Sequence, residues 1–166
     1  MKRLSLLVIF TLLYVSCGRV TFNMSGASVG NARTCQINYF DNRAEILYAP
    51  LSGELTDALK DKIQSSTSLK LVTSNADVMF EGEITGYAIQ PQQISASGVA
   101  QKDRLTVTVR VRFTNELDPD KNFEKSFSRF DEYPGGEDIK AHESRLVGEI
   151  LVDIIEDIFN EAFAAW

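Results

Sequence analysis

The chain has few side chains that could act in nucleophilic or acid–base catalysis. It contains one histidine, His142, and two cysteines, Cys17 and Cys35. His142 falls in the first turns of a predicted helix, where a surface position is commoner than the role of general base. No serine, cysteine or lysine stands in a known nucleophile motif. We therefore expect a protein that is not an enzyme and that needs no cofactor.

One short segment resembles the start of a calcium loop. Asp118, Asp120 and Asn122 have the spacing that opens an EF-hand. The pattern then fails, because Phe123 stands where the loop needs glycine and Arg129 where it needs a bidentate glutamate. We expect a hairpin turn here and no metal site. The last predicted helix carries five carboxylates that we expect to form its solvated face: Glu149, Asp153, Glu156, Asp157 and Glu161.

A row of cations lies along one strand-like segment, although the chain has a formal net charge of -6. The row consists of Lys102, Arg104, Arg110 and Arg112. Guanidinium groups match the geometry of phosphates, so the row could bind a phosphorylated ligand. Alternatively, Glu81 and Glu83 pair with Arg110 and Arg112 across the strands, each pair contributing roughly 0.2 to 1 kcal/mol. We favour the ion pairs, which leave Lys102 and Arg104 without obvious partners.

Cys17 stands directly after a short apolar run. Residues 4–15 carry no charge and follow a basic start. The run is too short for a bilayer, which needs about 20 apolar residues, and residues 1–16 have the layout of a secretory signal peptide. A cysteine after a small residue resembles the lipobox of bacterial lipoproteins, although Tyr14 stands where leucine is usual. We expect lipidation of Cys17; the alternative is an ordinary signal peptide that is cut elsewhere.

Lipidation would tether the protein to a membrane. Acyl chains such as palmitate contribute about 0.8 kcal/mol per buried methylene, and two chains bind a membrane stably. Residues 17–32 then form a small, polar tether, and residues 33–166 form a single domain. Cys35 would have no disulfide partner, so we expect a buried and unreactive thiol. Loss of residues 1–16 would make the chain still more acidic, which argues against nucleic acid as a partner.

The pattern of apolar residues predicts two helices and several strands. Apolar residues recur at helical spacing over 51–66 and 139–163. Strand-like segments are expected at 34–40, 69–73, 77–89, 103–117 and 122–130. We expect the segments 69–73, 77–89 and 103–117 to be neighbours in one antiparallel sheet, with a long polar connection over 90–101. Both helices should cover one face of the sheet and leave the other face in water.

The two sides of the strand at 77–89 should carry different kinds of side chain. We expect Gly82 and Gly86 on the helix side, where their missing side chains would let a helix approach closely. Val78, Phe80, Ile84 and Ala88 share that predicted side. The opposite side should carry Glu81, Glu83, Thr85 and Tyr87, next to Arg104, Thr106, Thr108, Arg110 and Arg112.

Taken in order, the segments INYFDNRAEI, LTDALKDKIQSSTSLKLV, ADVMFEGEITGYAI, RLTVTVRVRFTNELDPDKNFEKSFSRF and DIFNEAFAAW resemble one family. The chain is similar to the lipopolysaccharide-assembly lipoproteins (LptE), in the form typical of Bacteroidota. The resemblance implies an α+β fold, with two helices packed on one face of a four-stranded, largely antiparallel or mixed sheet. It also implies a domain that plugs the outer-membrane barrel LptD, helps it assemble, and assists insertion of lipopolysaccharide into the outer leaflet.

The resemblance gives the cationic row a role. Family members bind lipopolysaccharide through basic residues, which implies that Lys102, Arg104, Arg110 and Arg112 contact lipopolysaccharide or the barrel partner. Residues 18–25 lack an acidic run like the surface-export signal of Bacteroidota lipoproteins, so we expect an outer-membrane protein that faces the periplasm. The alternative is a free-standing periplasmic lipoprotein that holds a small lipid or peptide between helices and sheet. A hydrolase is a third hypothesis, but it would need a nucleophile and a base that the sequence does not show.

Overall fold

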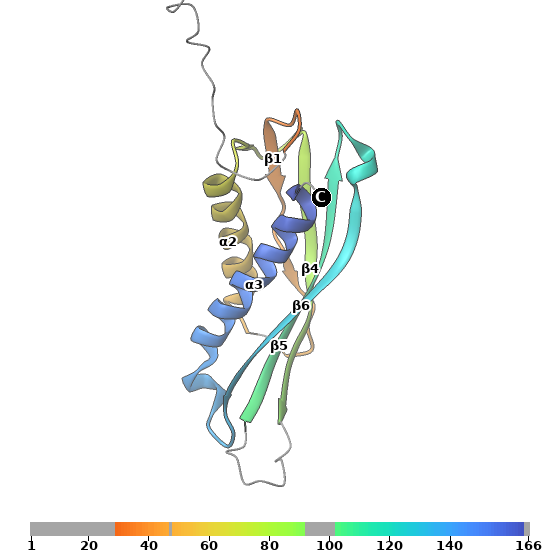
Figure 1. Ribbon diagram of the computed structural model, residues 1–166. Helices are drawn as coiled ribbons and strands as arrows, with labels where there is room; N and C mark the ends of the chain where they lie inside the picture. The colour runs from red at the N-terminus through yellow and green to blue at the C-terminus, as the bar shows by residue number, and fades with distance from the viewer. Residues whose placement is uncertain (1–28, 47, 92–101, 165–166) are drawn as a thin grey trace, which may run out of the picture.

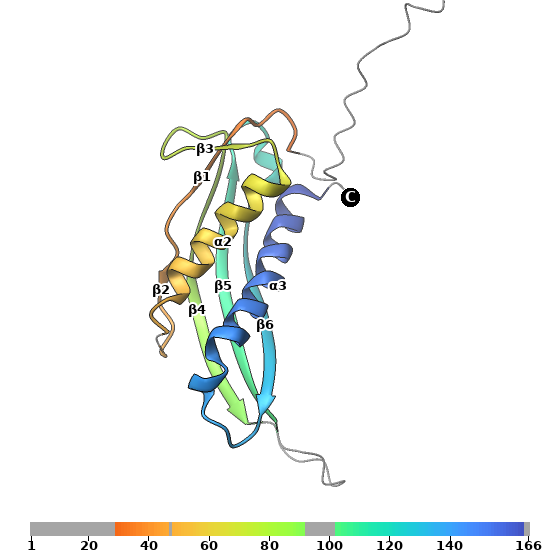
Figure 2. The ribbon, with the colours of Figure 1, turned by 90° about the vertical axis from the view of Figure 1, so that its left-hand side faces the viewer.

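The computed structural model describes residues 29–46, 48–91 and 102–164. They form an α+β domain in which two helices cover one face of a mixed sheet (Figures 1 and 2). The predicted signal peptide, Cys17, most of the tether and most of the 90–101 connection lie outside the described residues.

The elements follow the predicted order. The strands are β1 (Thr34–Ile37), β2 (Asp41–Asn42), β3 (Lys70–Leu71), β4 (Val78–Pro91), β5 (Lys102–Asn115) and β6 (Phe123–Pro134). The helices are α2 (Leu51–Ser66) and α3 (Glu143–Phe163), with short 3-10 turns η1 (Pro119–Lys121) and η2 (Ile139–Ala141). The helix expected to begin at Ile139 therefore begins at Glu143, after η2.

Each helix buries one stripe against the sheet. In α2 the buried apolar residues are four positions apart: Leu51, Leu55, Leu59 and Ile63. In α3 the buried stripe is wider: Leu146, Val147, Ile150, Leu151, Ile154, Ile155, Ile158, Phe159, Ala162 and Phe163. A stripe of this spacing lies on one side of a helix, so both helices are held by the same core.

The sheet differs from the prediction in strand number and order. Over the described residues it has six strands rather than four, in the order β3-β1-β4-β5-β6, and β2 also pairs with β4. The prediction that 69–73 is an antiparallel neighbour of 77–89 was wrong. Strand β3 pairs with β1, β1 pairs with β4, and both pairings are parallel. Because α2 carries the chain back before β3 begins, this connection is a crossover, which produces parallel strands.

A bulge in β4 changes which side chains face the helices. The register between β4 and β5 shifts between Ile84 and Gly86. Beyond the shift, Tyr87 is buried on the helix side at 4% exposure, instead of lying on the outer side as predicted. Gly86 and Ala88 move to the outer side, opposite Thr108 and Thr106. One extra residue reverses all later side chains of a strand, and Gly86, a glycine inside a strand, was the local signal of this bulge.

Gly82 does permit a close approach, but not of a helix. A Cβ built at Gly82 would lie 2.8 Å from the ring of Phe40 and 2.1 Å from the carbonyl oxygen of Arg110. Phe40, which precedes β2, is fully buried. The missing side chain therefore makes room for an aromatic ring, which corrects the prediction.

The core between helices and sheet is filled by side chains. Phe80, Phe113 and Phe163 lie with ring centroids 4.8 to 5.9 Å apart. Cys35 is fully buried, and burial raises the pKa of its thiol to about 12. The prediction that Cys35 is buried is therefore confirmed, and the raised pKa disfavours the reactive thiolate.

Candidate functional site

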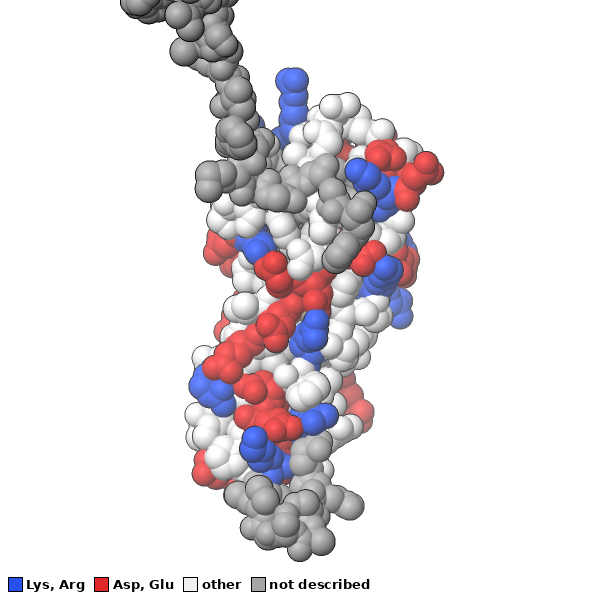
Figure 3. Space-filling view, viewed as in Figure 1, with Lys and Arg blue, Asp and Glu red and all other residues white. Residues whose placement is uncertain are grey.

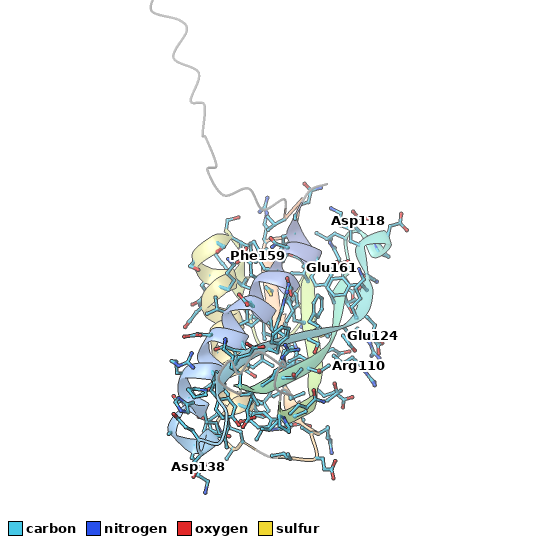
Figure 4. All side chains as sticks on the ribbon, turned by 60° about the horizontal axis from the view of Figure 1, so that its bottom comes forward. Arg110, Asp118, Glu124, Asp138, Phe159 and Glu161 are labelled. Atoms are coloured by element: carbon cyan, nitrogen blue, oxygen red, sulfur yellow. The ribbon has the colours of Figure 1, made fainter. Side chains whose placement is uncertain are left out.

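The predicted cationic row lies on the side of the sheet that faces away from the helices. We call this side the open face; it consists of alternate residues of β4, β5 and β6. Figure 4 shows Arg110 and Glu124 beside each other on this side of the sheet. The strong alternation of β5 positions the row, because every second residue from Leu105 to Phe113 is buried under the helices.

Arg112 is held by two carboxylates from the neighbouring strands. Its guanidinium lies 3.1 Å from Glu81 on β4 and 3.0 Å from Glu124 on β6. The hydrogen bond to Glu124, together with both negative charges, raises the pKa of Arg112 above its ordinary value. The pair with Glu81 confirms the cross-strand prediction. Glu124 was not among the predicted partners.

Arg110 is held more loosely. Its guanidinium lies 3.5 Å from Glu83, its direct partner in the β4–β5 register. This pair was also predicted, and it is confirmed. The arginine side chain is 52% exposed, so more of its hydrogen-bonding capacity faces solvent than that of Arg104, which is 29% exposed.

Lys102 and Arg104 share a partner that was not predicted from the sequence. Both pair with Glu132 on β6, at 3.3 Å and 2.9 Å. The hydrogen bond from Arg104, and then that from Lys102, lowers the pKa of Glu132. Arg104 also stacks on the exposed ring of Phe130, 3.7 Å from the ring centroid. Alternation along β6 places Glu124, Phe130 and Glu132 on the same side of the sheet as the row, so it could have predicted these contacts. The predicted strand, however, ended at residue 130.

Every cation of the row therefore has a carboxylate within ion-pair distance. The surface is polar, yet its charges are largely compensated within the sheet. A phosphate bound here would compete with carboxylates that are already in place. The geometry thus favours contacts with uncharged polar groups over simple anion binding.

Part of the open face is hollowed. A depression of about 400 Å³ is lined by Asn38, Tyr39, Glu81, Gly82, Glu83, Arg110, Arg112 and Glu124. It therefore brings two members of the row together with the segment that follows β1. The other two members, Lys102 and Arg104, are not among these lining residues.

The other residues considered as possible metal ligands or catalytic groups make structural contacts. Asp118 pairs with Lys121 at 3.5 Å, and the side chain of Asn122 accepts a hydrogen bond from the backbone N–H of Asn115 at 2.7 Å. These contacts build the turn at η1, so the predicted hairpin turn is confirmed. Among the residues that the structure describes, no cluster of His, Cys, Asp and Glu could hold a metal ion. His142 pairs with Glu137 at 2.5 Å beside the start of α3.

The carboxylates of α3 are not simply solvated. Figure 3 shows a band of acidic side chains along α3 with basic side chains beside it. Arg129 of β6 reaches Asp157 at 2.6 Å, Lys125 of β6 pairs with Glu161, and Lys62 of α2 pairs with Glu156. The prediction of a solvated helix face was therefore incomplete, because three of these carboxylates also join α3 to its neighbours.

The described part of the chain contains no helix that is long and apolar enough to cross a membrane.

The fold is similar to that of solved bacterial proteins. A minor lipoprotein from Acinetobacter baumannii superposes with a TM-score of 0.51 at 15% identity, over 78% of this chain and 91% of that chain. The hypothetical protein CT253 from Chlamydia trachomatis gives a TM-score of 0.51 at 12% identity, over 78% and 97%. A putative neuraminyllactose-binding hemagglutinin homolog from Helicobacter pylori gives 0.53 at 11% identity, over 79% and 83%. At these identities the likeness concerns the fold.

The comparison with curated protein sequences finds no match. The family model described as "LptE: Lipopolysaccharide-assembly" matches residues 32–162. This range begins just before β1 and ends within the last turn of α3, so it covers the whole sheet, all of α2 and all but the last residue of α3. The chain, with its two helices on one side of a mixed sheet, therefore belongs to the LptE family of lipopolysaccharide-assembly proteins.

Proposed function

We propose that this protein is an outer-membrane lipoprotein that fills the lumen of an LptD-type barrel, helps the barrel to assemble, and assists insertion of lipopolysaccharide into the outer leaflet. Membership of the LptE family supports the general role. The observation that carries the finer proposal is the open face, with its row of paired charges on the side away from the helices.

The open face suits a polar enclosure. A wide membrane barrel has a polar, water-filled lumen unless another part fills it. In this domain the apolar surfaces of both helices are buried against the sheet, and the opposite side presents arginines and lysine matched with glutamates. Such a domain can lie against a polar wall and keep its hydrogen bonds, without a large apolar interface.

The anchor forms the second part of the proposal. Lipid attached to Cys17 would hold the domain at the periplasmic side of the outer membrane, through residues 17–32. In Figure 1 the described chain begins near the end at which α3 finishes, while β4 ends and β5 begins at the opposite end. The anchor would therefore act on one end of an elongated domain and leave the β4–β5 end pointing away from it.

The row forms the third part. We propose that Lys102, Arg104, Arg110 and Arg112 contact the barrel wall or lipopolysaccharide. Their carboxylate partners favour hydrogen-bonded contacts with polar groups over capture of bare phosphate. Because each cation of the row is paired with a glutamate, charge reversal would place like charges side by side. Neutral substitutions are therefore the cleaner probes.

The test is recovery of a partner by the tagged full-length chain from detergent-solubilised outer membranes. We expect a barrel of the LptD type in a stoichiometric amount, and less of it with Arg110→Gln combined with Arg112→Gln. Lys140→Gln, a matched change of an exposed cation in η2, should recover as much barrel as the unaltered chain. Recovery of the chain without any barrel would contradict the proposal and favour the free-standing module.

The structure weighs against that module in one respect. The space between helices and sheet, where the module would hold its ligand, is occupied by the buried side chains of the core. The depression lined by Arg110 and Tyr39 lies on the other side of the sheet.

A further inference from the structure

Tyr39 stands between two depressions on the surface. It follows β1 and is 61% exposed, which is unusual for a large aromatic side chain in this domain. The first depression, of about 400 Å³, opens on the open face and includes Arg110 and Glu83. The second, of about 420 Å³, lies toward β3 and α2 and includes Gln36, Ile37, Lys60, Leu71, Val72 and Thr73. Asn38 and Tyr39 line both, so the two depressions adjoin at the tyrosine.

Neither depression offers an uncompensated positive charge. In the first, two arginines face three glutamates, and the contacts of 3.0 to 3.5 Å described above pair them. In the second, Lys60 pairs with Asp57 at 2.9 Å. A phosphate or other anion would therefore gain little from the net charge at either position.

Both depressions are nevertheless rich in hydrogen-bonding groups. The side-chain oxygen of Asn38 accepts a hydrogen bond from Gln36 at 2.7 Å, while its amide nitrogen contacts the sulfur of Met79 at 3.8 Å. Sulfur is a weak acceptor, so this amide keeps donor capacity for a ligand. Arg110, with five N–H donors and one loose ion pair, keeps such capacity as well.

Together these features match the chemistry of a neutral sugar. Hydroxyl groups both donate and accept, so they fit a surface of amides, carboxylates and guanidinium groups whose positive charges are already paired. The C–H face of a sugar ring is apolar and packs on an exposed aromatic ring such as that of Tyr39. Depressions of this size lie at the small end of the range of about 300 to 1,000 Å³ that is typical of ligand sites.

We propose that Tyr39 and the two adjoining depressions form a binding site for a neutral oligosaccharide, which crosses Tyr39 with sugar rings on both sides. The site would take the saccharide part of a glycolipid or another cell-envelope glycan, because both present the same hydroxylated rings. The site consists of residues of this chain alone, so its binding can be measured without a barrel partner.

The test uses the full-length chain, purified in detergent and immobilised for surface plasmon resonance. Three probes are compared: dephosphorylated and carboxyl-reduced core oligosaccharide released from lipopolysaccharide, carboxyl-reduced glycan fragments from peptidoglycan, and inorganic phosphate. We expect saturable binding of at least one of the two glycans, with a dissociation constant in the millimolar range or lower. Which of the two glycans binds then identifies the source of the natural ligand. Inorganic phosphate should not displace the bound glycan.

Matched substitutions locate the binding. Tyr39→Ala should weaken glycan binding by about threefold to tenfold, because it removes the stacking ring, whereas Tyr39→Phe should retain most of it. Leu117→Ala, another exposed apolar position at 54% exposure, should bind like the unaltered chain. The proposal is overturned if neither glycan binds at about 10 mM, a concentration that would reveal even millimolar affinity. It is also overturned if Tyr39→Ala binds as well as the original, or if phosphate displaces the glycan.

Discussion

At the scale of single residues, Gly82 shows how closely the centre of the sheet is packed. An added Cβ would meet the backbone oxygen of Arg110 and the buried ring of Phe40, and neither can move freely. We expect Gly82→Ala to lower the free energy of unfolding by about 1–3 kcal/mol, the usual effect of overpacking. Chemical denaturation followed by circular dichroism measures the change.

Gly148 provides the matched control for this prediction. It lies in α3, and an added Cβ would meet nothing within 4 Å. Gly148→Ala should raise the free energy of unfolding by about 0.5–1 kcal/mol, because alanine loses less backbone freedom in a helix. Equal effects of the two substitutions would contradict the packing described around Gly82.

Asp77 links the beginnings of β1 and β4 through one carboxylate oxygen. That oxygen accepts hydrogen bonds from the backbone N–H of Arg33 at 2.8 Å, and from the backbone and hydroxyl of Thr34, both at 2.9 Å. The bond from Arg33, then those from Thr34, lower the pKa of Asp77. A lowered pKa in the folded state stabilises the fold above the unfolded pKa, and that stabilisation is lost as pH falls through the folded value.

We therefore expect the stability of the unaltered chain to fall on acidification below about pH 4, the region of an ordinary aspartate pKa. Asp77→Asn should be less stable at neutral pH and should lose less on acidification. Denaturation at a series of pH values from neutral to acid compares the variants. Asp120→Asn, at an exposed position in η1, should keep the pH dependence of the unaltered chain; if Asp77→Asn also keeps it, this account of Asp77 is wrong.

The residue pairs of the open face were only partly predictable from sequence. Glu81 and Glu83 alternate with the same period as Arg110 and Arg112, so their pairing across a β4–β5 hairpin follows from periodicity. Glu132 lay beyond the end of the strand predicted for β6, so its two partners could not be assigned. The outward position predicted for Tyr87 failed because the prediction continued the two-residue alternation through the bulge after Ile84, which Gly86 signals.

At the scale of elements, β6 and α3 are joined by a seam of ion pairs. On the helix side of β6, Lys125 pairs with Glu161, and Arg129 pairs with Asp157 through two bonds of 2.6 and 2.7 Å. Asp131 continues the seam to Arg145 at 3.1 Å. The hydrogen bond to Asp157 raises the pKa of Arg129, as expected for a bidentate pair.

We expect this seam to contribute modestly to stability and to depend on salt. Arg129→Gln and Asp157→Asn should each destabilise the domain, and the double variant should lose less than the two losses added together. A double-mutant cycle by urea denaturation measures the coupling. The coupling should shrink in roughly 0.5 M salt, because exposed charges are screened there. If the losses in the free energy of unfolding are strictly additive at low salt, the interaction between Arg129 and Asp157 contributes nothing to stability.

The helices were easier to predict than the sheet order. The apolar repeat of α2 predicted Leu51–Ser66 to the residue, because helical spacing is a local signal. The place of β1 between β3 and β4 depends on a crossover through α2, which brings together residues far apart in sequence. Four residues of alternating pattern cannot specify such neighbours, so the parallel half of the sheet was missed.

At the scale of the whole molecule, the two cysteines should behave differently. Cys35 is buried with a raised thiol pKa, so it should not react, while Cys17 is the proposed lipid site. We expect Cys17→Ala to abolish palmitate labelling and to release the protein from the membrane fraction. Cys35→Ala should keep both labelling and membrane association. Labelling that persists in Cys17→Ala would contradict the proposed anchor.

The proposed plug also requires that a partner surround the domain. Ser126 lies exposed on the open face, opposite Arg110 in the β5–β6 register. Val152 is 68% exposed on α3, on the helix side. These two positions report on opposite sides of the molecule and carry side chains that the core does not use.

The most direct measurement is photo-crosslinking in living cells with a photoreactive amino acid placed at Ser126 or, separately, at Val152. If a barrel encloses the domain, both positions will crosslink to the same barrel protein of the LptD type. Crosslinks to that protein from only one side, or from neither, would contradict the account.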